Sequence, residues 1–357
     1  MRVVRGTSLL MSAMMLLASA SHASAAMLAG VDALKEWNLI VFNDMTAAHD
    51  VEGRSFVGAN LSGNSATFYN APGSNASLNN NPALTVVGDV TGGTKNLNNS
   101  GGANIGGNLA SQNGFNLNGT QTLNVGGTST QTNINQNVVN TNLGANFTNT
   151  LIAQRDLLIS SLGSLSQNLA ALANTGSASI ANNRLTINAS GSSQNVFNLT
   201  MADFNSFGEI SVVNPNGATV VINVSGATGT LADNFVNTAA DIGRNVVWNF
   251  YQATNLSFNN AFLGTVLATN AAVSNNNYIE GTLVANSFNQ NGEVHMDSFQ
   301  GSLTTGAVVS TAPEPSTWAM LILGFGLVGI ALRGRIGSRP TPTALARSSP
   351  YLPKLRR

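Results

Sequence analysis

Short apolar segments separated by pairs of glycine and asparagine decide the fold of this chain. They are Leu84-Thr85-Val86-Val87-Gly88, Ala103-Asn104-Ile105-Gly106-Gly107-Asn108, Phe115-Asn116-Leu117-Asn118-Gly119 and Leu123-Asn124-Val125-Gly126-Gly127. Apolar residues alternate with Asn or Thr, so each segment predicts a short strand with one side toward a core. Stacked Asn and Thr side chains form ladders, and glycine permits tight corners between strands. We therefore predict a mostly β fold, a β-solenoid of small stacked coils.

The rest of residues 27–312 continues this pattern and adds one helix. Two Gly-Thr-apolar-apolar-Ala units, Gly264–Ala268 and Gly281–Ala285, start 17 residues apart, which fits one coil. Residues 151–174 predict one amphipathic α-helix that flanks the sheet, because leucines recur at helical spacing: Leu158, Leu162, Leu165, Leu169 and Leu172. For residues 70–145, a polar Asn/Gly-rich linker is the alternative to ordered coils.

The composition excludes several classes of protein. Only 8% of the 357 residues are charged and 43% are hydrophobic, which is too little charge and too much apolar material for simple disorder. The absence of cysteine removes disulfides, thiolate metal sites and a cysteine nucleophile. Residues 27–312 carry six basic residues against fourteen acidic ones, so we expect no binding to nucleic acid.

Residues 1–26 have the three parts of a secretory signal peptide. Arg2 and Arg5 come first, an apolar run follows, and the small residues Ala23 and Ala25 form the cleavage site. We therefore expect the mature protein to be exported.

Residues 313–335 form a second targeting signal at the other end of the sequence. An acidic residue between two prolines is followed by an aromatic residue, a glycine-interrupted apolar run and a basic stop. The residues that define the signal are Pro313, Glu314, Pro315, Trp318, Arg333 and Arg335. The run from Trp318 to Leu332 would span roughly 22 Å as a helix, short of the ~30 Å hydrocarbon core, so it suits temporary retention better than a permanent anchor.

This string resembles the PEP-CTERM sorting signal of Gram-negative bacteria. The resemblance implies a transmembrane helix over 317–332, a transient inner-membrane intermediate, and processing by an exosortase. Release to the cell surface or into extracellular polysaccharide would follow. The chain departs from the usual pattern because residues 336–357 follow the basic stop, and their four prolines predict a disordered tail.

The order of segments over residues 32–300 resembles the choice-of-anchor A domain, an extracellular adhesin-like module. The most distinctive matching strings are Asp50-Val51-Glu52-Gly53-Arg54 and Trp248-Asn249-Phe250. The two Gly-Thr units also match, although they resemble ice-binding β-solenoids as well. The resemblance implies a β-helical surface domain with one flanking helix and no established catalysis. The match is poor over residues 70–145, which suggests an expanded Asn/Gly insertion.

A few polar residues are candidates for contact with a cation or a glycan. Glu293, His295 and Asp297 alternate along one predicted strand and share a face, as do Asp50 and Glu52 elsewhere. Carboxylates and an imidazole can bind a divalent cation, although a solvated strand face is the simpler interpretation. We expect no catalytic residue, no cofactor and no dedicated metal site.

The sequence favours a structural or adhesive role at the cell surface, where many weak hydrogen bonds to glycans add up. The alternative is an extracellular polysaccharide-modifying β-helix enzyme. Glu293, His295 and Asp297 lying beside Asp50 and Glu52 in one cleft would favour it, and scattered positions would count against it. A third hypothesis is ice binding, indicated by the alternating Thr128, Thr130 and Thr132, although one such row is not an array. Sugars could stack on aromatic side chains if these are exposed: Trp248, Phe250, Tyr251 and Tyr278. Trp248 and Phe250 share one strand face, which favours a place in the core for these two.

Overall fold

A computed structural model describes residues 27–305, apart from 74–75, 113, 132–137, 190, 192 and 238–241. The predicted signal peptide, sorting signal, transmembrane helix and tail lie outside the described residues. Residues up to Gly306 belong to one compact unit and Ala307–Arg357 to another. In the part of the chain that the structure describes, no helix is long and apolar enough to cross a membrane.

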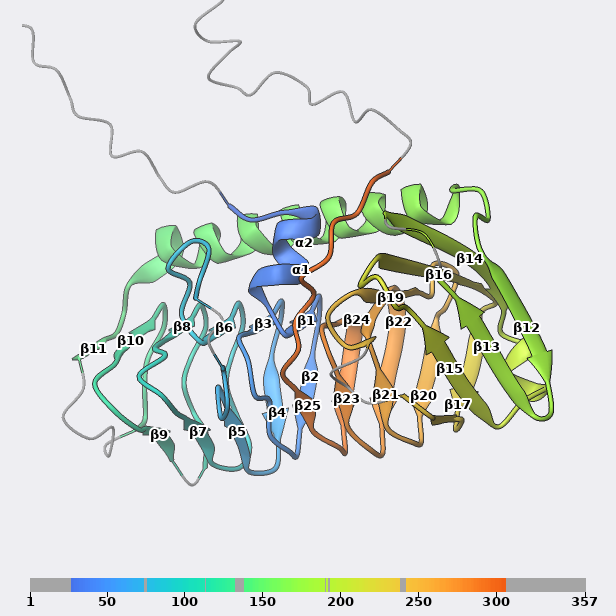
Figure 1. Ribbon diagram of the computed structural model, residues 1–357. Coiled ribbons are helices and arrows are strands. Elements are labelled where there is room, and N and C mark those ends of the chain that lie inside the picture. The colour runs from blue at the N-terminus through green and yellow to red at the C-terminus, as the bar shows by residue number, and fades with distance from the viewer. Residues whose placement is uncertain are drawn as a thin grey trace, which may run out of the picture. The chain divides into compact units, whose positions relative to one another are not determined.

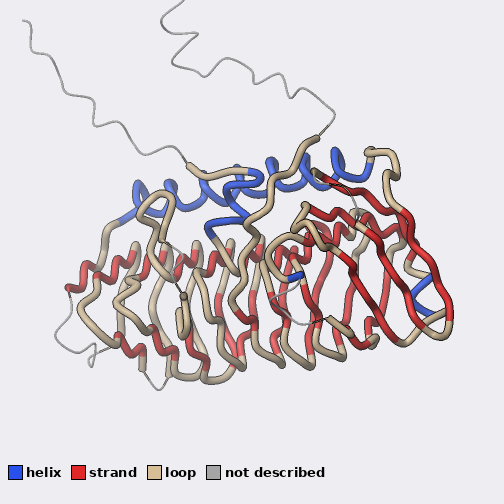
Figure 2. The backbone as a smooth tube through the Cα atoms, viewed as in Figure 1, coloured by secondary structure: helices blue, strands red, loops and turns tan. Residues whose placement is uncertain are grey.

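The described residues lie mostly in parallel β-strands, as the alternating segments predict (Figures 1 and 2). Neighbouring strands of the largest sheet follow the order β11 (Val138–Asn140), β10 (Thr122–Val125), β8 (Ala103–Ile105), β6 (Leu84–Val86), β3 (Ser55–Val57), β1 (Leu39–Val41), β24 (Leu283–Gln290), β22 (Thr265–Asn275), β19 (Val246–Asn249), β16 (Thr219–Ser225) and β14 (Gln194–Thr200). A second face of this sheet is formed by β2 (Met45–Ala47), β4 (Leu61–Gly63), β17 (Thr228–Leu231), β20 (Asn255–Phe258) and the later residues of β22 and β24.

Three smaller sheets complete the coils. Two are parallel: β5 (Ala66–Phe68), β7 (Lys95–Leu97) and β9 (Phe115–Leu117), and separately β21 (Phe262–Leu263), β23 (Ile279–Glu280) and β25 (Val294–His295). The third contains β12 (Ser177–Ala181), β13 (Arg184–Asn188), β15 (Glu209–Val213) and β18 (Asn234–Phe235). Of the strand pairs that the structure describes, only β12 with β13 is antiparallel.

The register confirms that one coil takes about the predicted number of residues. Leu267 pairs with Val284, 17 residues later, and Asn104 pairs with Asn124, 20 residues later. The shorter spacings in the sequence join strands on two faces of the same coil. The two kinds of spacing together explain why the sequence shows no single repeat length.

The order of the coils in space differs from their order in the sequence. The chain starts in the middle of the stack, because β1 pairs with β3 on one side and with β24 on the other. Successive coils lead outward from β1 to β11, a helix returns along the stack, and the later coils lead from β14 back to β24 (Figure 1). We call the contact of β1 and β2 with β24, and of residues 50–52 with β25, the joint.

Two α-helices cover one face of the largest sheet, where the sequence predicted one. The helix α2 (Gly144–Ala170) runs along the stack, and α1 (Gly30–Glu36) packs against it (Figure 1). The 27 residues of α2 span about 40 Å, most of the length of ten strand spacings of about 4.8 Å. The predicted bounds of 151–174 were wrong at both ends. The first turns carry no leucine stripe, yet Thr148 anchors them by donating to the Gly106 carbonyl over 2.7 Å.

The core fills the inside of the coils, and a second apolar cluster lies between the sheet and the helices. Leu84, Ile105 and Leu123 are fully buried, so the described residues of 70–145 form ordered coils and the linker hypothesis is wrong for them. Asparagine ladders join these coils on their outer side. The Asn124 amide donates to Asn104, and the Asn140 amide donates to Asn124, each over 2.9 Å.

The last described residues cross the edges of several coils. We call Phe299–Thr304 the strap. Its backbone N–H groups donate to four of the coils: Phe299 to Thr282, Gln300 to Arg244, Ser302 to Thr219 and Thr304 to Gln194. The strap therefore links the coils between β24 and β14 from outside the sheet.

Candidate functional site

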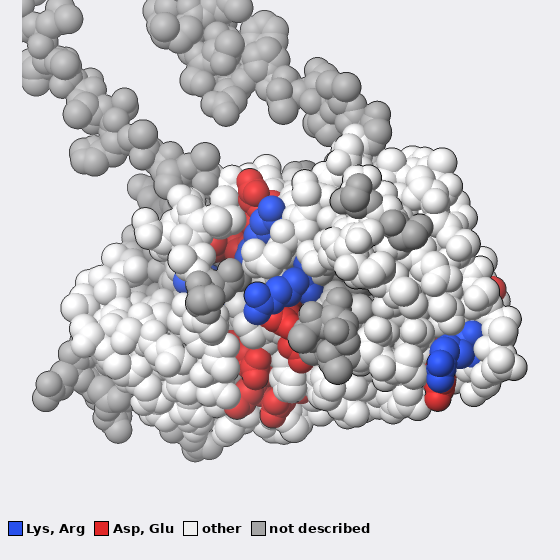
Figure 3. Space-filling model, in the orientation of Figure 1, with Lys and Arg blue, Asp and Glu red and all other residues white. Residues whose placement is uncertain are grey.

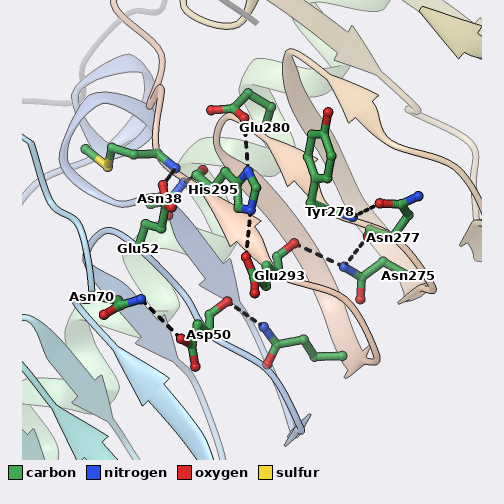
Figure 4. Close-up of polar contacts among 12 residues, drawn as sticks. Asn38, Asp50, Glu52, Asn70, Asn275, Asn277, Tyr278, Glu280, Glu293 and His295 are labelled. Carbon is green, nitrogen blue, oxygen red and sulfur yellow. Dashed lines mark hydrogen bonds and ion pairs between the residues drawn. The ribbon is translucent and has the colours of Figure 1, made fainter.

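Four of the five predicted polar residues lie together at the joint (Figure 4). The Glu52 N–H donates to the Val294 carbonyl, and the Val294 N–H donates to the Asp50 carbonyl, both over 3.0 Å. This backbone pairing brings the early segment beside β25 and so places Glu52 next to His295. Figure 3 shows most of the charged side chains on this face gathered in a central band, with one further charged group near one end and uncharged surface between them.

His295 is held between two carboxylates. Its Nε2 lies 2.7 Å from Glu293 Oε2, and its Nδ1 lies 3.2 Å from Glu280 Oε2. The ring stacks on Tyr278 with centroids 4.5 Å apart. The hydrogen bond to Glu280, with the bond to Glu293 and the charge of Glu52, outweighs burial and raises the pKa of His295 to about 9. The imidazole is therefore protonated at neutral pH and donates from both nitrogens.

The carboxylates of this cluster already have partners within the protein. Glu52 accepts from the Met296 N–H over 2.6 Å, and Asp50 accepts from the Thr67 N–H and the Asn70 amide, each over 3.1 Å. Among the described residues, no group of three or more His, Asp or Glu side chains is arranged to hold a metal ion. A protonated imidazole is also no metal ligand, so these contacts suit a structural cluster that fastens the joint.

The structure separates Asp297 from this cluster and adds Glu280. The strand β25 ends at His295, and Asp297 has a φ of 101° and pairs with Arg244 over 2.7 Å. The strand face that the sequence predicted for Glu293, His295 and Asp297 therefore does not extend to Asp297. Sequence reasoning missed Glu280, although it pairs in register with His295 one coil later. Its signal was the 15-residue spacing, which is close to the length of one coil.

A second candidate is the outer side of β17, β20, β2, β4 and the later parts of β22 and β24, which we call the polar face. Small side chains, all of them polar except Ala272, align across its adjacent parallel strands in two rows. Row one is Thr230, Ser257, Ser274, Asn289, Thr46 and Ser62. Row two is Thr228, Asn255, Ala272, Ser287, Asp44 and Asn60. The alternate residues of the same strands are buried in the core, for example Leu256, Val273 and Phe288.

A groove of about 970 Å³ lies on the polar face. Ten residues of the two rows line it, five from each. Met201, Ala202 and Asn205, from the segment around the 3-10 helix η1 (Asp203–Asn205), line it as well. Asp44 is the only side chain of the lining that carries a formal charge. The groove was not predicted, because its two rows combine strands from both ends of the sequence.

The comparisons with known proteins identify the domain. Residues 30–296, about three quarters of the chain, match the ice-binding-like adhesive domain. The chain belongs to that family. Residues 311–336 match the PEP-CTERM protein-sorting motif, in agreement with the resemblance of the C-terminal string. No curated protein matches the sequence.

One solved structure shows a weak likeness to this ice-binding-like adhesive domain protein. It is the crystal structure of an ice binding protein from an Antarctic bacterium Flavobacteriaceae. The likeness covers 74% of this chain and 82% of that chain, at 14% sequence identity and a TM-score of 0.27. A likeness of this strength carries no argument about the fold or the ligand.

Two of the aromatic candidates of this ice-binding-like adhesive domain lie in its core, as their shared strand face indicates. Trp248 and Phe250 are fully buried in the core, so neither can stack on a sugar, and Tyr278 is covered on one side by His295. Thr128 continues row two beyond Asn108, and Thr130 continues row one beyond Ala110. These threonines thus belong to different rows, while Thr132 lies outside the described residues.

Proposed function

We propose that this protein is exported and acts in adhesion at the cell surface or in the extracellular polysaccharide. The single observation that carries this proposal is the presence of an adhesive domain and a PEP-CTERM sorting motif on one chain. An exosortase processes the motif after a transient inner-membrane intermediate held by residues 317–332. The strings that resemble the choice-of-anchor A family support the same surface role.

The surface chemistry supports a polysaccharide partner. Most of the charged side chains visible in Figure 3 lie in a central band, and the polar face offers hydroxyl and amide groups in regular rows. Each hydrogen bond to a glycan is weak in water, but a long surface makes many of them at once. The acidic body does not suit nucleic acid.

The role is binding without catalysis. A glycosidase uses two carboxyl groups that flank the scissile bond. The groove has only Asp44, and the carboxylates at the joint are bonded to His295, to backbone N–H groups and to a neighbouring amide. Glu293 and His295 do lie beside Asp50 and Glu52, the arrangement that would favour the alternative, a polysaccharide-modifying enzyme, whereas Asp297 lies apart with Arg244. Because the carboxylates of this cluster are already bonded within the protein, we favour adhesion without a cofactor.

The test is expression in a host that has an exosortase and in one that lacks it, followed by cell fractionation and intact mass measurement. We expect loss of the mass beyond the Pro313–Pro315 region, with protein in the surface or matrix fraction, only in the host with the exosortase. A variant with Pro313, Glu314 and Pro315 replaced by alanine is the matched control and should stay uncut in both. Full-length protein in the inner membrane of both hosts would overturn the sorted surface role.

A further inference from the structure

We propose that the groove on the polar face binds a single chain of an uncharged polysaccharide, laid across the strands along the two rows. This inference rests on the proposed adhesive function and adds to it a site and a class of ligand. The groove is distinct from the charged cluster at the joint, because the two share no lining residue.

Charge decides the class of polysaccharide. The groove is lined by no Lys or Arg, so a polyanion would find no counter-charge there, and the acidic excess of residues 27–312 would repel it. A polycation would find only Asp44, whose Oδ1 already accepts from the N–H and the side-chain amide of Asn60, each over 3.0 Å. An uncharged polymer meets neither penalty.

The rows supply the matching hydrogen-bonding groups. Serine and threonine hydroxyls donate and accept, and asparagine amides do both from separate atoms, as required for sugar hydroxyls whose orientation varies. Adjacent strands lie about 4.8 Å apart, which is close to the length of one pyranose unit in an extended chain. Successive sugars therefore meet successive strands, from Thr230 through Ser257 and Ser274 to Asn289.

The wall of the groove is built in advance of binding. Met201 is fixed by its N–H bond to the Ser225 carbonyl over 2.7 Å, and Asp203 accepts from the Thr200 N–H over 2.7 Å to hold the turn. The absence of a side chain at Gly229 leaves room for the Met201 thioether, since a Cβ there would overlap it. A preformed wall with an apolar side suits the C–H face of a sugar ring and avoids the entropy cost of ordering a loop.

The experiment measures retardation of the purified full-length protein in native gels that contain a soluble neutral glucan, with polygalacturonate as the anionic counterpart. Ser274→Arg places a long side chain in the groove. Ala110→Arg is the matched control, because Ala110 is exposed and follows the same row outside the groove. Asn289→Ala removes one hydrogen-bonding group. Thermal melting verifies that each variant is folded.

We expect the neutral glucan to retard the wild type and the Ala110→Arg variant alike, and Ser274→Arg to bind about tenfold more weakly. For Asn289→Ala we expect about a fivefold loss, the effect of one hydrogen bond. Equal retardation of all folded variants would overturn the groove while leaving the adhesive function standing, and stronger binding to polygalacturonate would overturn the ligand class. No binding by the wild type to any polysaccharide or cell surface would instead refute the adhesive function itself.

Discussion

Removal of the imidazole at position 295 should weaken the fold in a pH-dependent way. His295 lies between Glu280 and Glu293 at the joint and has a pKa of about 9, against 6.5 for the free side chain. A histidine with a raised pKa stabilises the fold fully below pH 6.5, and this contribution is lost as the pH rises through 9. The variant His295→Gln should therefore be less stable than the wild type at pH 6 and nearly equal to it at pH 10.

The magnitude follows from the two pKa values. The difference of about 2.5 pH units, at about 1.4 kcal/mol each, sets an upper bound of about 3.5 kcal/mol. The imidazole is 25% exposed and the Glu293 side chain is 49% exposed, so solvent screens the pair. We expect a loss of about 1 to 2 kcal/mol in the free energy of unfolding at pH 6.

Urea denaturation at pH 6, 8 and 10 measures this difference. Other groups titrate in the range, notably Lys95 with a pKa lowered to about 8 by burial, but they are common to both proteins and cancel in the comparison. His49→Gln is the control, because His49 is exposed and should contribute little at any pH. An equal loss for His295→Gln at pH 6 and pH 10 would refute the ion-pair explanation of the joint.

Three further experiments test the packing and the buried charge. Leu162→Ala should lower the free energy of unfolding by about 2 to 5 kcal/mol, because Leu162 is fully buried on the side of α2 that faces the sheet. Ile159→Ala, at a 40% exposed position of the same helix, should cost much less, and melting temperatures compare the two variants. Gly126→Ala should destabilise the coils, since its Cβ would overlap a carbonyl of the preceding coil. A Cβ at Gly163 meets no other atom, so Gly163→Ala should stabilise α2 by about 0.5 to 1 kcal/mol. A loss of stability on Gly163→Ala would contradict this account. Lys95→Met should remove a contribution to stability that grows between pH 8 and 10.5. In this range the unfolded chain still holds a proton that the buried Lys95 amine has released. Denaturation of both proteins across this pH range measures the difference.

Local pattern predicted the elements of this fold well. The alternation of Leu123, Asn124 and Val125 marks a strand because the inner and outer sides of a coil differ in polarity. The leucine stripe marks the C-terminal half of α2 for the same reason. The start of α2 was missed because residues 144–150 rest on coil edges through polar contacts such as that of Thr148 with Gly106, which leave no apolar period.

The order of the coils could not be predicted from local pattern. The open edge of a parallel strand accepts any strand of similar register, so nothing in Leu39–Val41 specifies that Leu283–Ala285 lies beside it. The groove was missed for the same reason, since Thr46 lies next to Asn289 only after the joint forms. Of the predicted site residues, Glu52, Glu293 and His295 were found by their alternation, and Glu280 required knowledge of the coil length.

The strap determines how mechanical load reaches the domain. A pull on the chain beyond residue 305 acts first on Thr304, whose backbone is bonded to the Gln194 side chain over 2.7 and 3.0 Å. The next bonds, at Ser302 and Gln300, bear load only after the two bonds at Thr304 have broken. The hydrogen bonds of the strap therefore break one after another and not all at once. A force on the chain beyond residue 305 thus breaks individual hydrogen bonds of the strap before it acts on the strands of the sheet. The strap would dissipate mechanical work in this way before a force applied to the chain beyond residue 305 distorts the polar face.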